Sequence, residues 1–142
     1  MLLGLHPLLS PDLLHALASM GHGDEILLAD ANFPAASHAR RLVRMPGTRV
    51  DDVLAAVLSV MPLDSFVDVA SYTMQVVGDA GSVPDVVVGA NAVLARHGGH
   101  PAGTLERFAF YERAAKAYAV VATGEPRAYG NVLLRKGVVP PA

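Results

Sequence analysis

The stretch EILLAD, residues 25–30, decides the fold class. Its four central apolar residues follow one another without polar alternation, which is typical of a strand covered on both faces, as in α/β proteins. Asn32 and Pro34 then end the apolar run, because both residue types favour turns. The pattern predicts a buried strand with Asp30 at its carboxyl end.

Helical and strand-like segments alternate along the rest of the chain. Ser10 and Pro11 predict the capped start of one helix, and Gly21 and Gly23 predict its end. Further helices are predicted from Asp51 or Asp52 to about Pro62, over 84–99 and over 107–117, and strands over 41–45, 70–77, 118–123 and 131–136. Residues 84–99 also hold a valine run that favours a strand, but their length favours a helix. The alternation predicts an α/β fold: one layered domain, residues 1–142, with a mostly parallel or mixed sheet flanked by helices.

The composition is apolar for a chain of 142 residues. Only 17% of its residues are charged, against roughly 25% in an average soluble protein, and the mean hydropathy is +0.37. A monomer of this size would leave part of its apolar surface in water. We therefore expect a homo-oligomer that buries this surface between subunits.

Charge, hydropathy and cysteine content exclude several classes of partner. A net charge of −2 with dispersed arginines gives no basic stripe, so nucleic acid is not expected. No uninterrupted apolar run approaches the roughly 18 residues of a membrane span, and the start lacks a basic segment and a cleavage site of a secretion signal. The absence of cysteine excludes disulfides and thiolate nucleophiles, and it suits the cytoplasm. We expect a cytoplasmic protein without a membrane partner.

Two polar residues flank the predicted buried strand. Asp30 follows it, where ligands bind in open α/β sheets; the alternative is that Asp30 caps the next turn through its side chain. His22 precedes it between two glycines and can carry protons both ways near neutral pH; the alternative is an exposed histidine at a helix end. In a straight strand the eight steps between them span roughly 26 Å. If both serve one site, the segment folds back or two subunits contribute.

Two further positions are candidates for ligand recognition. Tyr129, Gly130 and Asn131 combine a phenol, a glycine that permits close backbone approach, and an amide; the alternative is an ordinary turn before a strand. Arg107 precedes a helical segment and could bind an oxygen-rich ligand through its fork of donors; the alternative is a surface arginine. Residues alone leave these alternatives open.

Motifs of metal and nucleotide chemistry are incomplete in this chain. His97 and His100 form the HGGH segment, but its two glycines disrupt the helical geometry that would align the imidazoles, and a zinc site needs three or four convergent ligands. Gly21 and Gly23 do not complete a dinucleotide fingerprint, and no G-x-S-x-G element is present. We expect neither a metal nor a cofactor.

Three blocks of sequence, taken together, resemble one known family. The blocks SPDLLHALASMGHGDEILLADANFP (10–34), RFAFYERAAKAYAVVATGE (107–125) and YGNVLLRKGV (129–138) are similar to the ribose-pyranase and fucose-mutarotase family. Their order and spacing agree across nearly the whole chain, whereas residues 67–102 match poorly. The ribose branch typically has histidine at the position of Arg107, which favours the fucose branch.

The resemblance implies an isomerase that interconverts the α and β anomers of a free monosaccharide, L-fucose above all, without metal, nucleotide or redox cofactor. It also implies a homo-oligomer, with ring-shaped decamers known in the family. His22 matches the proton-donor position, and we expect Asp30 to share the acid/base work. The sugar-contacting positions match Asp30, Arg107, Tyr129, Gly130 and Asn131. The alternatives are a D-ribose pyranase, a non-catalytic sugar-binding module and a structural oligomer without ligand.

Overall fold

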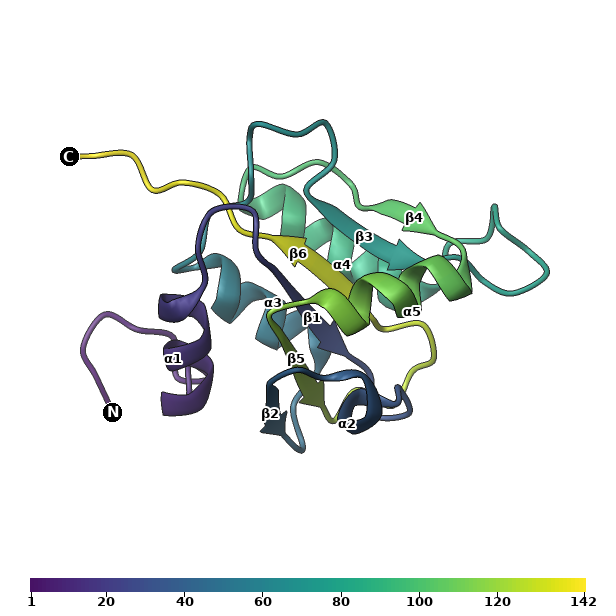
Figure 1. Ribbon diagram of the computed structural model, residues 1–142, viewed down its shortest axis with the longest axis horizontal. Coiled ribbons are helices and arrows are strands. Elements are labelled where there is room, and N and C mark those ends of the chain that lie inside the picture. The colour runs from purple at the N-terminus through teal and green to yellow at the C-terminus, as the bar shows by residue number, and fades with distance from the viewer.

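Six strands form one mixed sheet in the order β2-β5-β1-β6-β3-β4 in the computed structural model, which describes residues 1–142 (Figure 1). The strands are β1 (Glu25–Ala29), β2 (Leu42–Met45), β3 (Ser71–Met74), β4 (Gly103–Leu105), β5 (Ala119–Thr123) and β6 (Val132–Arg135). Five of them run in one direction, and only β6 is antiparallel to its neighbours β1 and β3. The predicted α/β fold with a mostly parallel or mixed sheet is confirmed.

Helices cover both faces of this sheet. They are α1 (Pro11–Ser19), α2 (Ala35–His38), α3 (Val50–Leu58), α4 (Asp85–Arg96) and α5 (Arg107–Lys116). α1, α3 and α4 cover one face, and α2 and α5 cover the other (Figure 1). In β1, Ile26 and Leu28 pack into a core with α1, α3 and α4, whereas Leu27 and Ala29 pack into a second core with α2 and α5. All four side chains are fully buried. This two-sided burial explains why residues 26–29 are apolar without alternation.

The local signals in the sequence act as expected at most element boundaries. The Ser10 hydroxyl accepts a hydrogen bond from the N–H of Leu13 (3.3 Å) and Pro11 begins α1. Residues 85–96 form the helix α4 that length favoured. The strand expected over 70–77 is shorter and ends at Met74. The short elements α2 and β4, with four and three residues, were not predicted, because neither is long enough to show a periodicity.

The direction of the strands gives the sheet two chemically distinct ends. At one end, which we call the carboxyl edge, β1, β3, β4 and β5 finish and β6 begins. The chain places Asp30, Arg107 and Asn131 directly beside these strand ends. At the other end, the opposite edge, β1 begins after His22 and β6 finishes at Arg135. The candidate residues are therefore divided between two ends of one sheet.

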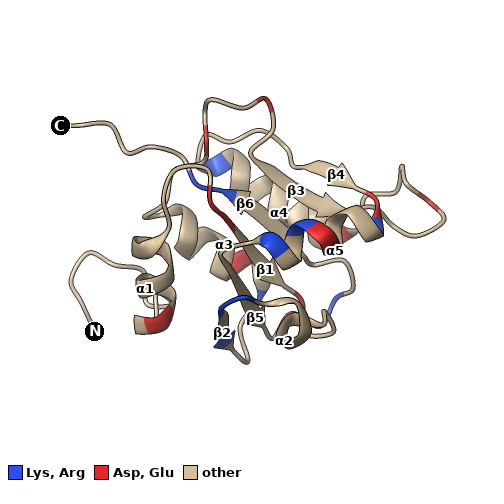
Figure 2. Cartoon of the chain, in the orientation of Figure 1, with Lys and Arg blue, Asp and Glu red and all other residues tan.

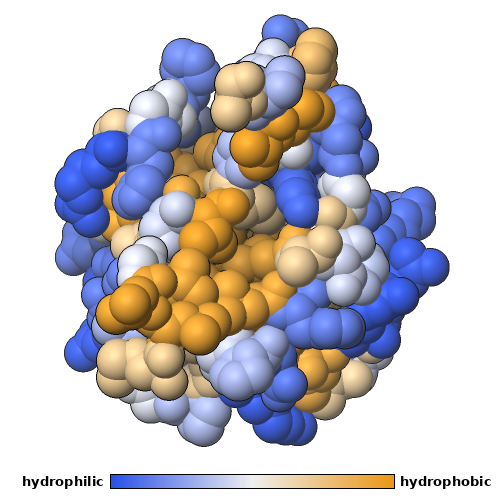
Figure 3. All heavy atoms as spheres, turned by 90° about the vertical axis from the view of Figure 1, so that its left-hand side faces the viewer, coloured by the Kyte–Doolittle hydropathy of each residue, from blue (hydrophilic) through white to orange (hydrophobic).

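Charge and apolar character are distributed differently over the surface. Acidic and basic positions are interspersed along the fold (Figure 2). Apolar side chains gather on the face that carries α1 and the two termini (Figure 3), where Met1, Leu2, Leu3, Val138 and Val139 are exposed. None of the helices combines the length and the apolar character needed to cross a membrane.

Candidate functional site

The Asp30 carboxylate lies buried at the carboxyl edge and contacts two different elements. Its Oδ1 accepts hydrogen bonds from the N–H groups of Asn32 (2.9 Å) and Phe33 (2.8 Å). Its Oδ2 accepts from Nδ2 of Asn131 (2.9 Å), and the Asp30 N–H donates to Oδ1 of Asn131 (2.9 Å). Asp30 thus caps the following turn, as one alternative from the sequence held, and it also pairs with Asn131, another candidate residue.

Tyr129 and Gly130 occupy backbone positions with little freedom. Tyr129 is the one non-glycine residue with positive φ (65°), a conformation that costs an L-residue energy and persists only where its surroundings enforce it. Its phenol oxygen accepts a hydrogen bond from the N–H of Val77 (3.1 Å), which leaves the O–H free to donate. A Cβ on Gly130 would lie 2.9 Å from Cγ of Glu125 and 3.1 Å from Val86. Position 130 therefore requires glycine.

Arg107 begins α5 at the same edge of the sheet. With Glu106 and residues 75–80 it lines an open cavity of about 350 Å³, and the same segment carries the Val77 N–H that holds Tyr129. None of the ion pairs within the chain involves Arg107. Its guanidinium lies 4.6 Å from the ring centroid of Phe108, which is largely exposed. The donors of Arg107 are available to a ligand.

His22 lies at the opposite edge and contacts a buried carboxylate that the sequence did not single out. Its Nε2 is 3.0 Å from Oδ1 of Asp64, while its side chain is 45% exposed. Asp64 also accepts from the Phe66 N–H (3.0 Å) and from Nε of Arg135 (2.8 Å). The Phe66 N–H, then Arg135 and His22, lower the pKa of Asp64 to about 2. Asp64 is thus ionised at neutral pH and orients the imidazole.

A single chain does not bring His22 to Asp30. The five residues of β1 separate them, which is about 16 Å of extended strand. The 21–24 segment does turn, because the Gly21 N–H donates to Oδ2 of Asp24 (2.8 Å). However, the Gly23 N–H bonds to the carbonyl of Lys136 (2.9 Å), which holds this turn at the far end of β6. The structure gathers Asp30, Arg107 and the 129–131 turn at one edge and leaves His22 at the other.

Neither histidine of the HGGH segment belongs to a cluster of metal ligands. His97 contacts the carbonyl of Val93 through Nδ1 (3.0 Å). His100 lines a cavity of about 390 Å³ at the opposite edge, together with Asp64 and Asp68. No group of three or more histidine, aspartate or glutamate side chains is arranged to hold a metal ion.

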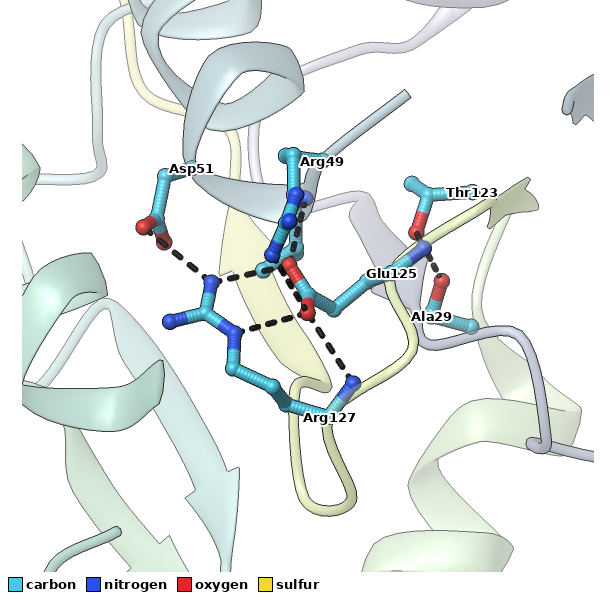
Figure 4. A network of polar contacts seen from close by, with 7 residues as sticks. Ala29, Arg49, Asp51, Thr123, Glu125 and Arg127 are labelled. Atoms are coloured by element: carbon cyan, nitrogen blue, oxygen red, sulfur yellow. Dashed lines mark hydrogen bonds and ion pairs between the residues drawn. The ribbon is translucent and has the colours of Figure 1, made fainter. Parts of the chain in front are cut away.

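A third buried carboxylate, Glu125, follows the end of β5 at the carboxyl edge (Figure 4). Its Oε1 accepts from the backbone N–H (3.0 Å) and Nε (2.8 Å) of Arg127, and its Oε2 accepts from Nη2 of Arg127 (2.9 Å) and the N–H of Val50 (3.3 Å). The Arg127 guanidinium lowers the pKa of Glu125 to about 2, against the opposing effect of burial. Nothing in the sequence predicts this ion pair, because the Gly and Pro residues around it indicate only a turn.

The carboxyl edge combines a carboxylate–amide pair, a phenol with a free proton and an unpaired guanidinium. These groups suit a small ligand with several hydroxyls, and they lie at the end of the sheet where α/β proteins bind ligands. The chain belongs to the RbsD / FucU transport protein family, whose family model matches residues 3–139.

Relatives match the chain over nearly its whole length. The fucose mutarotase of Homo sapiens is 48% identical over 96% of this chain and 93% of its own. The L-fucose mutarotase of Haemophilus influenzae strain PittGG is 46% identical over 99% of both chains. The crystal structure of the fucose mutarotase from Streptococcus pneumoniae, in complex with L-fucose, is 45% identical with a TM-score of 0.93 and covers 98% of this chain and 100% of that one.

Proposed function

We propose that this chain is an isomerase that interconverts the α and β anomers of L-fucose by opening and reclosing the sugar ring. The observation that carries the proposal is its full-length similarity to fucose mutarotases, including one solved with L-fucose. The polar groups at the carboxyl edge supply a physical basis, because they match a ligand with several hydroxyls.

Ring opening requires two proton transfers. The anomeric hydroxyl loses a proton while the ring oxygen gains one, and reclosure on the other face of the aldehyde reverses both transfers. We assign this exchange to His22. Its Nε2 faces the ionised carboxylate of Asp64, which only accepts hydrogen bonds, so Nε2 carries the proton of the neutral imidazole. Nδ1 is left as the atom that takes and returns the proton of the sugar.

The groups at the carboxyl edge hold the sugar in this scheme. Three N–H donors already contact Asp30, two at Oδ1 and one at Oδ2. A carboxylate has about four acceptor sites, so Oδ2 retains one for a sugar hydroxyl, and Asp30 can relay a proton there. Tyr129, Arg107 and the second amide hydrogen of Asn131 donate to other sugar oxygens, while Gly130 permits the close approach of the backbone.

We further propose that two copies of the chain form each complete site, with His22 from one and the carboxyl edge from the other. The division of these residues between opposite ends of β1 supports this arrangement. The exposed apolar face around α1 and the termini (Figure 3) supports a homo-oligomer, because such patches mark association surfaces. A decameric ring is the assembly that the family resemblance favours, and the cytoplasm is the proposed compartment.

Magnetisation exchange between the anomers of L-fucose, followed by NMR, tests the proposed activity. We expect exchange to be faster with the folded protein than in buffer, without added metal or nucleotide. Exchange at the buffer rate with sugar bound would indicate a binding module instead. If the protein accelerates the appearance of furanose signals from D-ribose more than it accelerates anomer exchange in L-fucose, the result would indicate a pyranase.

A further inference from the structure

The carboxylate of Glu125 contacts none of the proposed sugar-contacting side chains, yet Glu125 contacts both segments that carry them. We infer that Glu125 is a positioning residue that fixes the Asp30 turn and the 129–131 turn relative to each other, and so sets the affinity for the sugar. This inference rests on the proposed function, because it assigns a role to Glu125 within that same site.

The backbone of Glu125 is bonded to the Asp30 turn. Its carbonyl accepts a hydrogen bond from the N–H of Ala31 (2.8 Å), the residue directly after Asp30. The Thr123 hydroxyl donates to the carbonyl of Ala29 (2.7 Å) and accepts from the Glu125 N–H (3.2 Å). These three bonds hold residue 125 against the end of β1 on both sides of Asp30; Figure 4 shows the two bonds of the Thr123 hydroxyl.

The side chain of Glu125 fixes the other turn. Its carboxylate binds the backbone N–H and both ends of the guanidinium fork of Arg127, so the loop is closed into a tight unit two residues before Tyr129. Its Cγ forms the wall against which Gly130 packs, since a Cβ there would lie at 2.9 Å. A displacement of this side chain therefore moves Gly130, and with it the neighbours Tyr129 and Asn131.

The N-terminus of α3 anchors this unit to the scaffold. The Val50 N–H, at the first residue of α3, donates to Oε2 of Glu125 (3.3 Å), where the helix dipole favours a negative charge. Asp51 of the same helix lies 3.5 Å from Nη2 of Arg127. The charged pair is thus held by a packed helix, which is a more rigid support than the loop itself.

Glu125→Gln is the direct test, because glutamine keeps the volume and the Cγ wall but loses the charge and one acceptor oxygen. We expect the KM for L-fucose to rise about ten-fold, because a charged hydrogen bond that fixes the turn is lost. We expect kcat to stay within about two-fold, because His22 is untouched and the binding of the ground state and of the transition state weakens equally. Arg127→Gln, at a partly exposed position, is expected to raise KM similarly. The double variant is expected to add little to either single one.

Two controls separate positioning from stability. Arg49→Gln removes a cation that is 3.9 Å from Glu125 and more than half exposed, and its KM is expected to equal that of the wild type. Val53→Ala creates a small cavity under α3, at a fully buried position that takes no part in the hydrogen bonds of the Glu125 and Arg127 side chains, and is expected to lower the melting temperature. Its KM is expected to stay unchanged at temperatures well below unfolding.

The outcomes distinguish this inference from the proposed activity. If the wild type accelerates anomer exchange but Glu125→Gln and Arg127→Gln leave KM unchanged, the positioning role is wrong and the activity stands. If Val53→Ala raises KM as much as they do, the effect is one of stability and the role is also wrong. If the wild type binds L-fucose without accelerating exchange, the activity is wrong, and the dissociation constants of the same variants then test positioning. A wild type that does neither overturns both.

Discussion

Asp30 and Asn131 exchange two hydrogen bonds of 2.9 Å, although 101 residues separate them in the sequence. The pair joins the end of β1 to the start of β6, and both side chains are buried. Because each side chain already has a hydrogen-bond partner in the other residue, neither has to rearrange when a ligand binds. The carboxyl edge is therefore preorganised. Asn131 holds the Asp30 carboxylate in place, and the remaining acceptor site of Asp30 is left for a ligand.

Asn131→Ala tests this pair. The substitution strands the backbone N–H and Oδ2 of Asp30 in a buried place, so we expect a loss of about 1–3 kcal/mol in the free energy of unfolding together with weaker binding of L-fucose. Urea unfolding and a sugar titration measure the two effects. Asn91→Ala, which removes the hydrogen bond from the Ala102 N–H (2.9 Å) just before β4 begins, is the matched control, because it is expected to cost stability without weakening sugar binding. Equal stability of Asn131→Ala and wild type would contradict the preorganised pair.

The sequence predicted the sheet because its signals are local. The apolar run 26–29 and the Ser10 cap each depend on residues within a few positions, and both appear as expected. Asp64 and Glu125 could not be found in this way. Arg127 is close to Glu125 in the sequence, but His22 and Val50, further partners of Asp64 and Glu125, lie 42 and 75 residues away. Only the folded chain shows that both carboxylates are buried beside these partners. The separation of His22 and Asp30 follows from β1, which lies between them, and the sequence indicates it. The meeting of Asp30 with Asn131 depends instead on the pairing of β1 with β6.

Two of the three buried carboxylates predict how stability changes with acid. Asp64 and Glu125 have a pKa of about 2 in the folded chain, below the ordinary values of 3.8 and 4.5. A group with a lowered pKa stabilises the fold fully above its ordinary pKa and loses that contribution as the pH falls toward the folded value. We expect the urea midpoint to fall between about pH 5 and pH 2. Burial raises the pKa of Asp51, and this group contributes with the opposite sign.

Glu125→Gln provides the control for this acid dependence. Glutamine does not titrate, so the variant is expected to be less stable than the wild type at pH 7 and to lose less of its remaining stability between pH 5 and pH 2. Denaturation series at matched ionic strength measure both slopes. Parallel curves for the two proteins would show that folding does not lower the pKa of Glu125.

Arg107→His tests the origin of sugar preference. Since Arg107 pairs with no acid in the chain, its substitution is expected to leave stability nearly unchanged and to act on the sugar alone. Loss of a charged hydrogen bond is expected to slow the L-fucose reaction by roughly ten- to a hundred-fold and to reduce the preference over D-ribose. NMR exchange on both sugars measures this. An unchanged preference would place discrimination elsewhere and would favour the pyranase alternative.

The division of His22 and Asp30 between two ends of β1 predicts complementation between inactive variants. His22→Ala lacks the proton carrier of the opposite edge, and Asp30→Asn lacks the carboxylate of the carboxyl edge, so each homo-oligomer is expected to be nearly inactive. If each site takes one edge from each of two chains, an equal random mixture leaves about a quarter of the sites with both edges intact. Unfolding the two proteins together, refolding them and measuring L-fucose exchange is expected to recover activity near that fraction.

His22→Ala mixed with Asp64→Asn is the control, because both lesions lie at the same edge, 3.0 Å apart, and no site regains an intact pair. Native mass spectrometry confirms that mixed oligomers have formed, and Arg107→Ala replaces Asp30→Asn if that variant does not refold. Absence of recovery in confirmed mixed oligomers would show that the two edges do not meet across a subunit boundary, and His22 would lose its proposed part in the reaction.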